Sequence, residues 1–171
     1  MQVRDAIHDV SCQVTWVRAA QRHLTLRFFA DAAEVDVAGL REGMDAACHA
    51  LPLFTTQLEG LGVFPESGPP RVLWMGVSAG RESVEALARA LTSALAPCGW
   101  PAEERAFHPH ITLGRIKQTG DRQGLVAALQ RCRNATSAPF EVEGLALIRS
   151  ALSSRGPQHT TIYHATLRSH T

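Results

Sequence analysis

The sequence HITLGR occupies residues 110–115, and the sequence HLTLRFF occupies residues 23–29. Each stretch begins with His-x-Thr and continues into Leu. In an extended strand the side chains alternate between two faces, so the histidine and the threonine share one face while their aliphatic neighbours share the other. We therefore expect two amphipathic strands, each of which presents an imidazole beside a hydroxyl group.

The His-x-Thr pattern occurs four times, beginning at His23, His110, His159 and His164. Chance predicts about half an instance in a chain of this composition, so a single match would carry little weight. Three of the four continue into Leu, and the motif alone leaves His164 open as an alternative. The stretch that begins at His110 also carries Arg115, whose guanidinium suits bidentate contacts with phosphate.

Composition and charge limit the class of protein. The 171 residues are 45% hydrophobic and 19% charged with a net charge of +1, which is typical of a globular chain and not of a basic-tailed polyanion binder. No apolar run has the length of a membrane span, and the first residues lack the pattern of a signal peptide. The four cysteines lie far apart without a Cys-x-x-Cys, which favours free thiols in a reducing cytoplasm.

Apolar periodicity and turn residues predict a mixed order of strands and helices. We expect helices over residues 35–51, 83–95 and 123–132, a short helix before Val10, and a loop over residues 62–70. The extended segments expected are 13–18, 23–29, 53–61, 71–77, 110–116, 140–149 and 160–167. This order predicts an α+β fold formed by residues 1–171 as a single domain of two intertwined lobes, with one histidine strand in each half.

Two such strands that face each other would create a cleft with two imidazoles and two hydroxyl groups. In-line hydrolysis of a phosphodiester needs one base for water, one acid for the leaving oxygen, and donors for the phosphate oxygens. Imidazole titrates near neutral pH, so one ring can be neutral while the other is protonated. The sequence therefore predicts acid–base catalysis by His23 and His110 without a metal cofactor.

A metal site is the competing interpretation of the second motif. His108 and His110 form a His-x-His pair, whose imidazoles would share one face of a strand. No Asp or Glu stands nearby at ligand spacing. We therefore expect no metal and assign His108 to the edge of a cleft or to solvent.

The chain resembles the RNA 2′,3′-cyclic phosphodiesterases, or 2′-5′ RNA ligase-like proteins, of the two-histidine phosphoesterase superfamily. The two motifs carry this resemblance together with GVFP at residues 62–65 and PRVLW at residues 70–74. It extends from about Val14 to the C-terminus. It implies a bilobal fold with two antiparallel sheets, related by a pseudo-two-fold axis, on either side of a central cleft, and helices on the outside.

The resemblance also implies roles for individual residues. His23 would be the proton donor to the 3′ oxygen, and His110 the proton acceptor from water, although the sequence leaves these two roles interchangeable. Thr25, Thr112 and Arg115 would bind the phosphate. Phe28 would stack on the terminal base, although strict alternation directs its side chain away from the face that carries Thr25.

One feature departs from the family's pattern. Members begin with an apolar strand followed by a helix, whereas residues 1–7, MQVRDAI, resemble the middle of that helix. We therefore expect the first strand to be missing and one edge of a sheet to be open.

The expected function is hydrolysis of RNA 2′,3′-cyclic phosphate ends to 2′-phosphomonoesters by a cytoplasmic monomer. RNA ends and short oligonucleotides are the expected partners, with nucleotides as further candidates and no membrane. Two alternatives stay open. The same site would also support 2′-5′ RNA joining, and the fold would also serve as a non-catalytic RNA- or nucleotide-binding module.

Overall fold

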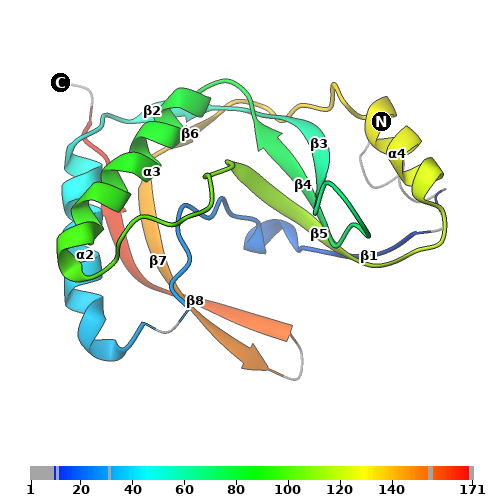
Figure 1. Ribbon diagram of the computed structural model, residues 1–171. Helices are drawn as coiled ribbons and strands as arrows, with labels where there is room; N and C mark the ends of the chain where they lie inside the picture. The colour runs from blue at the N-terminus through cyan, green and yellow to red at the C-terminus, as the bar shows by residue number, and fades with distance from the viewer. Residues whose placement is uncertain (1–9, 11, 31, 154–155, 170–171) are drawn as a thin grey trace. The chain divides into compact units, whose positions relative to one another are not determined.

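The computed structural model describes residues 10, 12–30, 32–153 and 156–169 (Figure 1). The chain divides into two compact units, each made of three separate segments. The first unit consists of Met1–Thr25, Thr56–Ala79 and Pro109–Phe140, and the second of Leu26–Thr55, Gly80–His108 and Glu141–Thr171. Antiparallel sheets and α-helices build both units, which confirms the α+β class. The short helix expected before Val10 falls mostly on residues 1–9, which lie outside the described residues.

A four-stranded antiparallel sheet forms the centre of the first unit. Its order is β1 (Cys12–Trp16), β5 (His110–Thr119), β4 (Val72–Val77) and β3 (Leu58–Phe64). One face is apolar: Leu73, Met75 and Val77 alternate along β4 and are buried. The helix α4 (Arg122–Arg131) contacts β3 and contributes its own buried residues to this unit.

The helix α4 begins where the sequence provides a cap. The side chain of Asp121 accepts a hydrogen bond of 2.8 Å from the backbone N–H of Gly124, which satisfies a donor of the first turn. Leu125 and Ala128 then bury the apolar side of the helix. The prediction of a helix over residues 123–132 is therefore correct to within one residue at each end.

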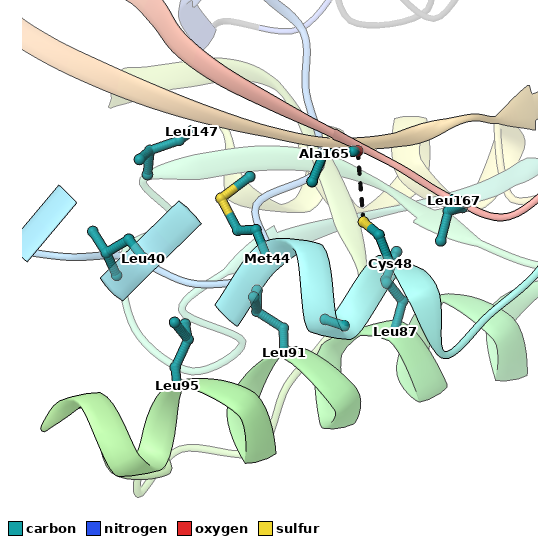
Figure 2. Close-up of a cluster of buried hydrophobic side chains, with 10 residues drawn as sticks. Leu40, Met44, Cys48, Leu87, Leu91, Leu95, Leu147, Ala165 and Leu167 are labelled. Carbon is teal, nitrogen blue, oxygen red and sulfur yellow. Dashed lines mark hydrogen bonds between the residues drawn. The ribbon is translucent and has the colours of Figure 1, made fainter. Parts of the chain in front are cut away.

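The second unit contains two helices and a long hairpin. Helices α2 (Val37–His49) and α3 (Arg81–Leu95) lie side by side, and the hairpin pairs β7 (Gly144–Ser153) with β8 (Gly156–Thr166) (Figure 1). A cluster of buried apolar side chains joins them (Figure 2). Its members are Leu40, Met44, Ala47, Cys48, Leu87, Leu91, Leu95, Leu147, Ala165 and Leu167.

The helical stripes read from the sequence are the faces that form this cluster. Leu40, Met44 and Ala47 of α2 are almost fully buried, as are Leu87 and Leu91 of α3. Short 3₁₀ helices flank the two helices, η2 (Glu34–Asp36) before α2 and η3 (Ala96–Cys98) after α3.

The strands differ from the predicted ones at several places. Residues 53–61 form two strands, β2 (Phe54–Thr56) and β3, and residues 140–149 fall into β6 (Phe140–Val142) and β7; β2 pairs with β6. The predicted loop over residues 62–70 starts three residues later, because β3 continues to Phe64. Gly62 suits this strand because the indole of Trp74 on β4 occupies the space of a Cβ there.

Candidate active site

The two His-x-Thr segments meet in the first unit through a single backbone bridge. Leu24 forms an isolated antiparallel bridge with Ile111 of β5. The predicted strand over residues 23–29 is therefore wrong: only Leu24 pairs, because the 3₁₀ turn η1 (Ala19–Gln21) interrupts the edge strand after β1. Both histidines lie in the first unit.

The bridge brings the two His-x-Thr motifs side by side. Leu24 and Ile111 are opposed; His23 and Thr25 flank Leu24, and His110 and Thr112 flank Ile111. If its antiparallel register extended by one residue in each direction, His23 would stand opposite Thr112 and Thr25 opposite His110. Opposed Cβ atoms lie about 5 Å apart and diagonal ones about 7–8 Å, and the two histidines would then be the diagonal pair. Such a spacing leaves room for one phosphate between two imidazoles.

A β-bulge brings Arg115 to the face of Thr112. Strict alternation from Thr112 would send a residue three positions later to the opposite side. The register between β4 and β5 shifts by one residue, however: Trp74 pairs with Thr112, and Val72 pairs with Arg115. Because Val72 and Trp74 are two residues apart on a regular strand, their partners share one face. The buried Leu113 is the extra residue that reverses the alternation, and the exposed Arg115 lies on the face of Thr112.

The imidazole of His23 is oriented by its own loop. Its Nδ1 lies 2.9 Å from the backbone carbonyl oxygen of Gln21. A carbonyl only accepts, so Nδ1 carries the hydrogen in this contact. The His23 side chain is exposed, as a group that meets a substrate must be.

The imidazole of His110 lies against two aromatic rings of the same unit. The ring of Phe64 contacts it edge to face with centroids 5.1 Å apart, and the indole of Trp74 lies 6.1 Å away. Neither aromatic residue was among the site residues expected from the sequence. The signal that would have found Trp74 is the alternation of β4, which puts it on the face opposite the buried Leu73 and Met75.

Three candidates from the sequence belong to the second unit. Phe28 has 72% of its side-chain surface exposed in a segment without regular structure, so the alternation argument does not apply to it. His164 and His159 lie on β8 opposite Ala146 and Ser150 of the hairpin. Both lie in the second unit, which separates the His164 motif from the pair in the first unit.

The described residues contain no group of three or more His, Cys, Asp or Glu side chains arranged to hold a metal ion. Over the same part of the chain, no helix is long and apolar enough to cross a membrane. Cys12, Cys48, Cys98 and Cys132 are all free thiols, as the sequence predicts. Cys48 and Cys132 are buried, whereas Cys98 is exposed and Cys12 is half-buried.

Comparison with known proteins places this geometry in a family. The model of the 2′-5′ RNA ligase superfamily matches residues 5–153, which include the His-x-Thr-Leu segments that begin at His23 and His110. The chain belongs to this superfamily. An RNA 2′,3′-cyclic phosphodiesterase of Aeropyrum pernix is 32% identical over 95% of this chain and 91% of its own length. Another, from Aquifex aeolicus, is 34% identical over 90% of this chain and 82% of its own length.

Solved structures share the fold of this chain. The crystal structure of TT0787 from Thermus thermophilus has a TM-score of 0.75 at 28% identity and covers 92% of this chain and 84% of its own. The structure of E. coli LigT complexed with 3′-AMP has a TM-score of 0.66 at 24% identity, with 90% and 81% covered, a likeness of fold alone. The two-histidine phosphoesterase fold expected from the sequence is thereby confirmed.

Proposed function

We propose that this superfamily member is an RNA 2′,3′-cyclic phosphodiesterase that opens the cyclic phosphate to a 2′-phosphomonoester without a metal cofactor. The observation that supports it most strongly is the bridge between Leu24 and Ile111, which joins the two His-x-Thr motifs within one unit. The curated relatives in Aeropyrum pernix and Aquifex aeolicus carry the name of this activity.

The proposed reaction uses the two imidazoles as a general base and a general acid. Water attacks phosphorus, a new P–O bond forms, and the bond from phosphorus to the 3′ oxygen breaks. His110 accepts the proton of the attacking water, and Nε2 of His23 gives a proton to the departing 3′ oxygen. The two protonation states are exchanged after one turnover, and proton exchange with solvent restores them.

The remaining polar groups of the site would hold the phosphate. Hydroxyl groups of Thr25 and Thr112 donate to the non-bridging oxygens, where negative charge accumulates in the transition state. Arg115 neutralises that charge with two parallel N–H donors. Phe28 is assigned to the terminal base, because an exposed aromatic ring stacks on any base.

A short RNA with a 2′,3′-cyclic phosphate end, assayed in excess EDTA, tests this function. We expect turnover to persist in EDTA and kcat to fall about 10²–10⁴-fold in His23→Ala and in His110→Ala. His164→Ala is the matched control, because it removes an exposed histidine from the same tetrapeptide on β8. Loss of activity on chelation, or equal losses in all three variants, would contradict the two-histidine mechanism.

The name of the matched superfamily favours 2′-5′ RNA joining as a second candidate reaction. Joining adds a 5′-hydroxyl of RNA to the same phosphorus in place of water, so it needs the same acid and base. Incubation of cleaved RNA halves shows whether the cyclic end is opened or sealed. Binding of the halves without either product would instead indicate a non-catalytic RNA-binding module.

We also propose that the enzyme works as a monomer in the cytoplasm on RNA ends, short oligonucleotides or nucleotides. Four free cysteines, two of them buried, support a reducing compartment. Light scattering during size-exclusion chromatography would test the monomer, and a mass of twice 18.5 kDa would contradict it.

A further inference from the structure

The imidazole of His110 is enclosed by aromatic rings that the proposed reaction does not use. Phe64 lies at the end of β3, and its ring stands at 82° to the imidazole with centroids 5.1 Å apart. Trp74 of β4 reaches both partners, with centroids 5.1 Å from Phe64 and 6.1 Å from His110. The three rings therefore form one connected group across three adjacent strands, which we call the aromatic clamp.

Gly62 provides the space that the clamp needs. It pairs with Trp74 across β3 and β4, and a Cβ at this position would lie 2.1 Å from Cζ2 of the indole and 2.4 Å from Cη2. Both distances are far inside van der Waals contact, so any side chain there must displace the ring. The indole thus occupies the space beside the Gly62 backbone, where its ring also contacts Phe64 and His110.

We propose that Phe64 and Trp74 are positioning residues for His110 and that Gly62 sets the position of the clamp. This inference rests on the proposed function, in which His110 exchanges a proton with the attacking water. An imidazole on a strand has two rotatable bonds, and an edge-to-face contact with Phe64 together with a tilted contact with Trp74 restricts both. Because a misplacement of about 1 Å can cost about a hundredfold in rate, a fixed ring orientation contributes directly to kcat.

Variants of the clamp separate positioning from stability. We expect Trp74→Leu and Phe64→Leu each to lower kcat about tenfold while KM stays within about twofold, because no group that holds the phosphate changes. Trp74→Phe, which restores an aromatic ring, should recover most of the lost rate. Gly62→Ala should also lower kcat, although its methyl group reaches His110 only through the indole.

Leu73→Val is the matched control for loss of stability. Leu73 is a fully buried neighbour of Trp74 on β4, and its side chain points to the opposite face of the sheet. We expect this variant to lose thermal stability but to keep its kcat. If Leu73→Val and Gly62→Ala have equal melting temperatures and also show equal losses of kcat, the clamp acts only through stability and the inference is overturned.

A measurement that needs no catalysis keeps this inference distinct from the proposed function. Aromatic rings about 5 Å away shift the proton resonances of the His110 imidazole through their ring currents. We expect Phe64→Leu and Gly62→Ala to move these resonances, and Leu73→Val to leave them in place. Unchanged resonances in both clamp variants would refute the positioning role. If the wild-type chain does not hydrolyse the cyclic phosphate but the His110 resonances move in the clamp variants, the proposed function is refuted and the positioning of His110 is not.

Discussion

At the scale of single residues, Arg115 shows where the expected alternation of side chains along a strand fails. The spacing His-x-Thr-x-x-Arg cannot put all three side chains on one face of a regular strand. The shift of register between Leu73 and Trp74 resolves the conflict, since it adds Leu113 as an extra residue. A bulge leaves no reliable trace in local composition, so the face of Arg115 could be inferred from the family resemblance but not from alternation.

The geometry of Arg115 can be tested by a substitution that keeps the charge. We expect Arg115→Lys to raise KM for a cyclic-phosphate RNA about tenfold, because an ammonium cannot give two parallel hydrogen bonds to one phosphate. Lys117→Arg is the control, a change of the same kind two residues further along β5. An equal KM for Arg115→Lys and the wild type would show that the charge alone is sufficient.

Cys48 provides a pH-dependent prediction at the same scale. Burial raises the pKa of its thiol from 9.0 to about 11, and the backbone at Leu145 partly offsets this effect. The folded chain therefore holds this proton more tightly than the unfolded chain, so the contribution to stability is complete below pH 9 and is lost as the pH rises towards 11.

Thiol labelling tests the burial of Cys48 that raises its pKa. At pH 8 we expect a thiol-specific reagent to modify the exposed Cys98 quickly and Cys48 only after unfolding. Cys98→Ser removes the fast phase and isolates the slow one. Fast modification of Cys48 in the native Cys98→Ser variant would contradict the burial of this side chain.

At the scale of elements, the helices were the most predictable part of the molecule. Leu40, Met44, Leu87 and Leu91 repeat at helical spacing, and this period alone indicates which faces are buried. The strands near the site were less predictable, because pairing with distant segments decides their extent. Leu24 pairs only because Ile111, 87 residues further along, lies beside it.

Two glycines of α2 give opposite predictions. A Cβ at Gly43 would lie 2.4 Å from Cδ2 of Leu95 on α3, whereas one at Gly39 would make an ordinary contact of 3.4 Å with Sγ of Cys98. We expect Gly43→Ala to lower the free energy of unfolding by about 1–3 kcal/mol through overpacking. Gly39→Ala should raise it by a few tenths to about 1 kcal/mol. Denaturant titration of both variants provides the measurement, and a stabilised Gly43→Ala would contradict the close approach of these helices.

At the scale of the whole molecule, charge is divided unequally between the units. The first unit, which contains both histidines, has nine Lys and Arg against five Asp and Glu, a net charge of +4. The second has eight against eleven, a net charge of −3. The overall net charge of +1 does not reveal this difference between the units. The sequence does not show it as a run of charge either, because neither unit is contiguous along the chain.

This asymmetry predicts a dependence on salt that grows with substrate length. Phosphates next to the cyclic end would meet the positive unit, so KM for an oligonucleotide should rise steeply between about 50 and 200 mM salt. KM for a cyclic mononucleotide, which has one phosphate, should rise much less. Equal salt dependence for both substrates would show that only the terminal phosphate is bound.

The first unit consists of three segments that lie far apart in the sequence, and this affects how it folds during synthesis. Cys12 pairs with Thr119 and Leu24 with Ile111, so a growing polypeptide must release 111 of its 171 residues from the ribosome before Leu24 can meet its partner. Contacts of such long range form slowly. A nascent chain halted before β5 would contain His23 but not His110. Because the segments of the first unit alternate with those of the second along the chain, no single truncation of the gene yields the first unit alone.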